Sequence, residues 1–266
     1  MSSYLSYYLL LGNFLYLIIF ILGLVVGSFI NAWVWRTREN FRIISGRSMC
    51  PTCHRKLRWF ENIPVVSFIF LKGRCRGCRR PIPKHYAFVE LATGFVFLLV
   101  TWYSMQNHAG GYLFFLRNLI FSVFLIIVFV YDWLYQEIVS DIVWFGSLVG
   151  VSFNYYLKDD FSLYLVAVAV AGGFFLLQFV ISKGRWIGGG DVRLGVMMGL
   201  WLGWPYILAA LFIAYITGAI WSLFLLLIRK KTLQSATPFG THLALATFIC
   251  LLWGPNLVNW YMQFLQ

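Results

Sequence analysis

The class of fold is decided by the stretch FLYLIIFILGLVVGSFINAWVW, residues 14–35. It contains no charged side chain, and as a helix rising 1.5 Å per residue it would cover about 33 Å. That length matches the roughly 30 Å hydrocarbon core of a bilayer. Arg36 and Arg38 follow at once, and no basic segment leads into the run as in a cleaved signal peptide. We therefore predict a retained first transmembrane helix.

The composition of the whole chain extends this prediction to a polytopic membrane protein. Of 266 residues, 61% are hydrophobic and only 11% are charged, whereas about a quarter are charged in a typical soluble domain. Backbone groups in lipid must be satisfied within their own segment, so the spans should be helices. We predict an all-α fold with about eight transmembrane helices. They are expected near residues 14–35, 87–105, 112–131, 138–157, 161–181, 192–204, 206–228 and 240–254.

Positive charge is confined to a few hydrophilic segments. Nineteen of the 21 Lys and Arg residues lie in three of them, at 36–85, 182–193 and 229–231. Cytoplasmic loops of membrane proteins carry such an excess. The net charge of +12 therefore indicates topology and contact with anionic lipid, and not binding of nucleic acid. We expect these three segments to face the cytoplasm and the N-terminus to lie outside.

The segment 36–86 differs in composition from the rest, because it is basic and holds four of the five cysteines. Cys50 and Cys53 form one C-x-x-C pair, and Cys75 and Cys78 form another. Two such pairs can complete a tetrahedral, structural zinc site in a zinc-ribbon-like domain. The spacing leaves iron, dithiols and disulfides open, although a cytosolic location disfavours disulfides. We divide the chain into a first span, a cytosolic tetra-cysteine domain and a transmembrane domain, at residues 1–35, 36–86 and 87–266.

Acidic residues number only nine, and two of them have an unusual setting. Asp132 follows the apolar run 119–130, and Asp191 follows the three glycines of 188–190. Glycine permits a positive φ or the close approach of another segment. Carboxylates at membrane depth are costly and hence functional candidates, and a pair suits acid–base hydrolysis. Each also has a simpler interpretation, Asp132 as a solvated interfacial group and Asp191 as the N-cap of the next helix.

Several ordered motifs resemble those of the bacterial type IV prepilin peptidases, which are GxGD-type aspartyl proteases. The first is GLVVGSFIN at 23–31, and the cysteine segment continues the match from Ser48 to Cys78. The sequence VEL at 89–91 carries it into the second span. The glycine–aspartate motif is GGGDVRL at 188–194, and a final motif begins with PFG at 238–240.

The resemblance implies an endopeptidase of the bacterial inner membrane, with Asp132 and Asp191 as its catalytic pair. Its substrates would be type IV prepilins or type II secretion pseudopilins, cleaved after a leader glycine. It further implies N-methylation of the new amino terminus by S-adenosylmethionine, and Gly73 and Glu90 match motif positions of that half. Two alternatives are a peptidase without methyltransferase activity and a non-catalytic, membrane-anchored metal-cysteine protein.

The chain departs from the family pattern around both aspartates. After Asp132 the family usually has Ile-Pro, whereas here Ile138 is followed by Val139 and Ser140. Asp141 then falls one place late, which makes it a lesser candidate for the pair. The other departures are Arg193 for the usual Lys, and Thr241 and His242 where Pro and an aromatic residue are common.

Overall fold

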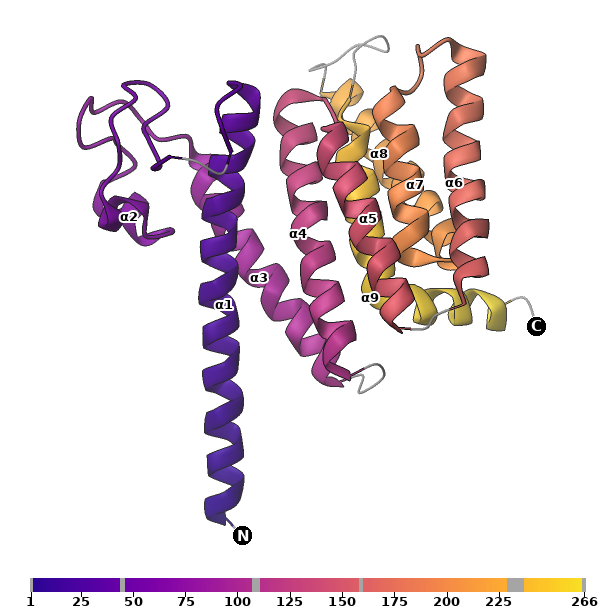
Figure 1. Cartoon of the computed structure of the whole chain (residues 1–266), viewed down its shortest axis with the longest axis horizontal. Helices are drawn as coiled ribbons and strands as arrows, with labels where there is room; N and C mark the ends of the chain where they lie inside the picture. The colour runs from indigo at the N-terminus through magenta and orange to yellow at the C-terminus, as the bar shows by residue number, and fades with distance from the viewer. Residues whose placement is uncertain (1, 44–45, 107–110, 158–159, 229–236, 265–266) are drawn as a thin grey trace. The chain divides into compact units, whose positions relative to one another are not determined.

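A computed structural model describes residues 2–43, 46–106, 111–157, 160–228 and 237–264. In these ranges the chain is almost entirely helical and contains no β-strand, which confirms the predicted all-α class (Figure 1). The predicted basic segment 229–231 lies outside the described residues. The elements are α1 Ser2–Arg38, η1 Trp59–Asn62, α2 Val66–Phe70, α3 Lys84–Gln106, α4 Gly111–Tyr135, α5 Ser140–Leu157, α6 Phe161–Ser182, α7 Gly189–Leu202, α8 Tyr206–Leu227 and α9 Phe239–Phe264.

Each of the eight predicted spans coincides with a helix. Six of them, in α1, α3, α4, α6, α8 and α9, are long and apolar enough to cross a membrane. The other two are α5, with 18 residues, and α7, with only 14. Most side chains of α7 are buried by neighbouring helices, so this short helix is shielded from lipid by protein. The protein is therefore a multi-pass membrane protein.

The last helix is longer than predicted. The apolar run was expected to end at 254, but α9 continues to Phe264 with Pro255 inside it. Figure 1 shows the yellow C-terminal part of α9 turning away from the preceding part. Proline removes a helix hydrogen bond and kinks a helix without necessarily ending it.

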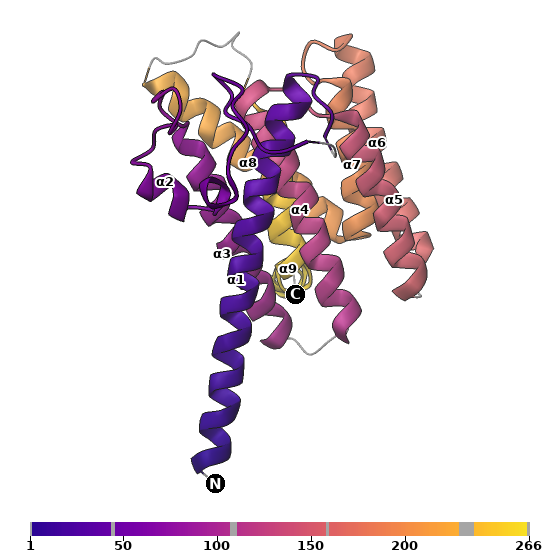
Figure 2. The same ribbon diagram turned by 60° about the vertical axis from the view of Figure 1, so that its left-hand side comes forward.

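The chain divides into two compact units, Met1–Phe115 and Leu116–Gln266. In the first unit α1 packs along α3 through glycines (Figure 2). A Cβ atom on Gly23 would lie 2.7 Å from Cα of Gly94, and one on Gly27 would lie 2.7 Å from Cα of Glu90. Small residues let helix backbones approach this closely in a membrane. The cysteine segment connects these two helices.

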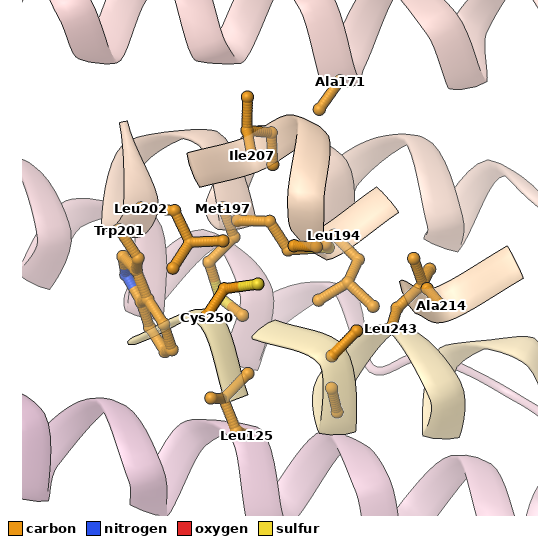
Figure 3. Close-up of a cluster of buried hydrophobic side chains, with 14 of the residues drawn as sticks. Leu125, Ala171, Leu194, Met197, Trp201, Leu202, Ile207, Ala214, Leu243 and Cys250 are labelled. Carbon is orange, nitrogen blue, oxygen red and sulfur yellow. The ribbon is translucent and has the colours of Figure 1, made fainter. Parts of the chain in front are cut away.

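In the second unit α7 forms the centre of the hydrophobic core. Trp201 and Met197 of α7 pack among Leu125 of α4, Leu243 of α9 and further apolar side chains (Figure 3). Trp201 stacks on Phe121 of α4 with 4.0 Å between ring centroids. These contacts hold α7 between the helices whose ends carry the polar site described below.

The fifth cysteine belongs to this same core. Cys250 is 2% exposed and packs with the apolar side chains around α7, as the apolar run that contains it indicates (Figure 3). Close packing also joins α7 to α6, because a Cβ atom on Gly199 would lie 2.6 Å from the backbone nitrogen of Val168. The core is thus built from both large rings and backbone contacts at glycine.

Candidate active site and metal site

The two C-x-x-C pairs sit in one kind of turn that is built twice. The Cys50 N–H donates to the Arg55 carbonyl at 3.0 Å, and 25 residues later the Cys75 N–H donates to the Arg80 carbonyl at 2.9 Å. The residue after each second cysteine is left-handed, with φ of 52° at His54 and 57° at Arg79. Such a conformation is uncommon outside glycine, and here it closes both turns around their sulfur atoms.

The four sulfur atoms form one compact group. All lie within 4.8 Å of one another, and the Sγ atoms of Cys50 and Cys78 are 3.9 Å apart. A tetrahedral ion with metal–sulfur distances of about 2.3 Å requires sulfur atoms roughly 3.8 Å apart, so these residues fit a bound metal. Burial opposes ionisation of Cys75, but backbone N–H groups of Cys78 and Gly77 bring the pKa of its thiol to about 6. Four cysteines leave no coordination position for water, as in structural sites.

An ion pair joins the first turn to η1. Nη2 of Arg55, from the first turn, donates to Oε1 of the buried Glu61 at 2.7 Å, and the Arg58 N–H donates to Oε2 at 2.8 Å. The hydrogen bond from Arg55 holds the pKa of Glu61 below its usual range. A Cβ atom on Gly77 would lie 2.9 Å from Nε of Arg55, so the arginine lies directly over the glycine of the second turn.

A carboxylate site forms in the second unit where three helix ends meet. Asp132 is in the last turn of α4, which ends before Gln136, a residue with φ of 55°. Asp191 is in the first turn of α7, and Thr241 is in the first turn of α9. Asp132 and Asp191 are only 4% and 8% exposed. Their surroundings meet at one side chain, because Ile138 lies against Gly190, the neighbour of Asp191, and against Gly240, which itself lies against the Asp132 carboxylate. Burial strengthens any interaction between charged groups because the local dielectric is low.

Each carboxylate has its own hydrogen-bond donors. Oδ2 of Asp132 accepts the Thr241 N–H at 2.6 Å and the Thr241 hydroxyl at 2.8 Å. Oδ2 of Asp191 accepts the N–H of Gly188 at 2.9 Å. Gly188 is the N-cap of α7 and Asp191 is the third helical residue (N3). One oxygen of Asp191 therefore accepts the backbone N–H of the N-cap residue, as the N3 side chain of a capping box does. The simpler interpretation of Asp191 as the N-cap itself is therefore wrong by three residues.

The glycines near the aspartates act by close approach and not by unusual backbone angles. None of Gly188, Gly189 and Gly190 has a positive φ, contrary to one of the two expectations for this loop. A Cβ atom on Gly190 would lie 2.9 Å from Cβ of Ile138, and one on Gly240 would lie 3.0 Å from its Cδ1. Ile138 thus packs against the beginnings of both α7 and α9, next to the two carboxylates.

Three of the residues that depart from the family pattern make contacts near the helix ends that carry the aspartates. The Arg193 guanidinium donates to the Ser140 hydroxyl at the beginning of α5, so two of the departures contact each other. Thr241, another departure, contacts Asp132. Asp141 lies in the first turn of α5 with an exposed side chain. No pattern in the sequence predicts the contact of Thr241 with Asp132, because the two residues are 109 positions apart and share no motif or period.

The predicted methylation residues lie in the first unit. Glu90 on α3 is 8% exposed, and its Oε2 accepts the Val65 N–H at 2.7 Å. It lines a cavity of about 120 Å³ together with Asn31 and Phe68. Oδ1 of Asn31 is buried and has no hydrogen-bond partner among the residues that the structure describes. Gly73 has φ of 65°, and a Cβ atom there would lie 3.2 Å from the Phe68 ring. The cavity therefore offers oxygen acceptors, but Arg36, Arg55 and Arg76 line it as well.

Comparisons with known proteins cover both units. Residues 21–104 match the family model for the Bacterial Peptidase A24 N-terminal domain, and residues 119–223 match the Type IV leader peptidase family. The prepilin leader peptidase/N-methyltransferase of Pseudomonas aeruginosa is 30% identical over 92% of each chain. The chain belongs to the type IV leader peptidase family. Relatives of the same name are 30% identical in Bacillus subtilis, over 92% of this chain and 97% of that protein, and 29% identical in Stutzerimonas stutzeri, over 92% of each chain.

Each of the two family matches contains one of the two sites. The N-terminal match contains all four cysteines and Glu90, and the leader peptidase match contains Asp132 and Asp191 but ends before Thr241. No solved structure matches the chain. For this leader peptidase family member, the arrangement of the site therefore rests on the contacts described above.

Proposed function

We propose that this protein is an aspartyl endopeptidase that removes the leader peptide of type IV prepilins or type II secretion pseudopilins after a glycine. One observation supports the proposal: two buried carboxylates, Asp132 and Asp191, lie at the ends of α4 and α7 beside Ile138, within the leader peptidase match. The relatives from Stutzerimonas stutzeri and Pseudomonas aeruginosa are named prepilin leader peptidases.

The paired carboxylates can perform amide hydrolysis without a covalent intermediate. Because like charges at close range disfavour double ionisation, one carboxyl group keeps its proton while the other is ionised. The ionised group takes a proton from water as its oxygen attacks the scissile carbonyl, and the protonated group donates to the carbonyl oxygen. Breaking the C–N bond then releases the leader carboxylate and, after proton transfer to nitrogen, the new amino terminus.

The test is co-expression with a prepilin, followed by measurement of leader removal and of the mass of the new N-terminus. Asp132→Asn and Asp191→Asn keep shape but cannot exchange the proton, so each should lower cleavage by at least about a thousandfold. The double variant should be no worse than either single one, because both groups act in one step. Asp141→Asn is the matched control, and it should retain most activity. Full cleavage by both single variants would refute the peptidase proposal.

We further propose that the first unit carries the methylation half. When bound, S-adenosylmethionine supplies an electrophilic methyl group on a sulfonium. The acceptors Glu90 and Asn31 Oδ1 fit the cationic end of that molecule. The cavity is smaller than the roughly 300 Å³ of typical ligand pockets, so it fits this end and not the whole cofactor. A side chain at Gly73 would press Phe68 toward the cavity.

The same mass measurement separates the two activities. With Glu90→Gln the leader should still be removed, but the product should lack one methyl group. A wild-type product without the methyl group would instead support the alternative of a peptidase that has no methyltransferase activity. A methylated product from Glu90→Gln would remove Glu90 from this role.

We propose zinc as the metal of the four cysteines, and a cytoplasmic location for their segment in a bacterial inner membrane. The excess of Lys and Arg in 36–85 supports this orientation, with the N-terminus outside. A periplasmic reporter fused near His108 should be active, and the same reporter near Arg55 should be silent. The opposite pattern would reverse the orientation. Zinc, in contrast to iron, should leave the purified protein colourless.

A further inference from the structure

We propose that Thr241 is a positioning residue that makes Asp132, and not Asp191, the ionised member of the carboxylate pair. Asp132 is then the base that takes a proton from water, and Asp191 is the acid that donates to the carbonyl oxygen. This inference rests on the proposed peptidase function and assigns the two roles within it.

The geometry of Thr241 favours a negative charge on Asp132. Its backbone N–H and its hydroxyl both lie within 2.8 Å of the same atom, Oδ2 of Asp132. An N–H group can only donate, and donors directed at a carboxylate stabilise its charged form. Both donors come from one residue in the first turn of α9, so they also fix the direction of the other oxygen, Oδ1.

The Asp191 carboxylate accepts fewer hydrogen bonds than the Asp132 carboxylate among the described residues. In the part of the chain that the structure describes, its carboxylate accepts one hydrogen bond, from the Gly188 N–H at 2.9 Å. The helix termini act in the opposite direction, because the start of α7 favours charge on Asp191 and the end of α4 disfavours it on Asp132. Hydrogen bonds to a charged group are the larger effect, and Asp132 has two of them from Thr241.

Other ionisable groups lie on the helices around the pair. Two of them, Arg193 and Tyr215, form hydrogen bonds with side chains other than the two aspartates. Arg193 on α7 donates to Ser140, and Tyr215 on α8 exchanges hydrogen bonds with Gln178. Asp141 on α5 is exposed, and His242 on α9 is half-buried. Tyr131 and Tyr135 share α4 with Asp132, and Glu137 follows that helix. The Thr241 variants proposed below leave all of these residues in the sequence.

Thr241 is one of the departures from the family motif described above, in which proline is common at this position. Proline has neither an N–H nor a hydroxyl to donate, so a chain with proline here would lack both donors to Asp132.

The test is the pH profile of kcat/KM for leader cleavage by the full-length protein in membranes. The acidic limb reports formation of the singly ionised pair, and the basic limb reports loss of its remaining proton. Thr241→Val keeps the N–H and the shape but removes the hydroxyl. Its acidic limb should move to higher pH by about one unit, which is a tenfold loss below that limb, while the basic limb stays in place. Thr241→Ser should restore the wild-type profile.

The matched control lies on the same helix. Thr247 is fully buried, and its hydroxyl donates to the Leu243 carbonyl at 2.6 Å, so Thr247→Val removes a hydroxyl from α9 without touching a carboxylate. It should shift neither limb. Thr241→Ala repeats the test if the valine variant does not fold, and metal content and membrane insertion report folding for all variants.

The remaining outcomes overturn the proposal in distinguishable ways. A shift of the basic limb alone would place the charge on Asp191. A lower rate with both limbs unmoved would reduce Thr241 to a structural residue. Cleavage that survives Asp132→Asn would instead refute the proposed peptidase function, whatever Thr241 does.

Discussion

The cysteine site and the carboxylate site are assembled in opposite ways. The four cysteines lie between residues 50 and 78, and each turn is closed by a hydrogen bond between residues five apart. The carboxylate site brings together Asp132, Asp191 and Thr241 from three helices, over a span of 109 residues. The first site is encoded by spacing along the chain, whereas the second exists only once α4, α7 and α9 have packed.

This difference predicts how each site fails. Damage to the cysteine site should remain in the segment that carries it, because its contacts are local. Damage to the carboxylate site can be caused by residues with no chemical role, because any change in helix packing moves the acids apart. Ile138 is such a residue, since it touches the glycines at the beginnings of both α7 and α9.

The largest expected effect is the loss of the metal from Cys75→Ser. Three thiolates leave an incomplete tetrahedron, and structural zinc contributes on the order of 10 kcal/mol to the fold that it holds. We expect bound metal to fall from about one ion per chain to almost none, and protease cleavage to become rapid within 46–83. The helices of 116–264 should keep their resistance.

Cys250→Ser is the matched control for this variant. Cys250 is buried in the hydrophobic core of the second unit and is not a member of the cluster of four, so the metal should be retained. A full complement of metal in Cys75→Ser would contradict the four-cysteine site. Loss of resistance throughout the chain would contradict the local character of the damage.

A smaller effect is expected from Gly190→Ala, which tests the distributed site. The added Cβ atom would lie 2.9 Å from Cβ of Ile138, and neither atom can rotate away because both are fixed to the backbone. Overpacking of this kind costs about 1–3 kcal/mol, so leader cleavage should fall by roughly 10- to 100-fold. Metal content should not change.

Gly173→Ala provides the comparison, because nothing lies within 4 Å of a Cβ atom at that helical position. Its cleavage rate should equal that of the wild type. Wild-type cleavage by Gly190→Ala would show that the carboxylates do not depend on the contact with Ile138, and the two sites would then differ less than their construction indicates.

The cysteine site could be predicted from the sequence more completely than the carboxylate site. The C-x-x-C spacing predicted one cluster of four sulfur atoms, because two residues between ligands leave little freedom. The apolar runs predicted the helices, but not that α9 continues through Pro255, because proline can kink a helix without ending it. Asp132 and Asp191 were paired by resemblance and by sharing a membrane face. The contact of Asp132 with Thr241 could not be predicted in this way, because it depends on how the end of α4 meets the beginning of α9.

The glycine contact between α1 and α3 has a consequence for the entropy of the segment between them. Gly27 and Glu90 touch, so the 62 residues that separate them form a closed loop as soon as the two helices pair in the membrane. Only the 45 residues at 39–83 lie outside the two helices, and closing a flexible loop of that length costs on the order of 3 kcal/mol, which pairing of the helices has already offset. The ends of the segment that carries the two cysteine turns are therefore already held together before the metal binds. Metal binding then has to offset only the entropy of closing the shorter loop between Cys53 and Cys75.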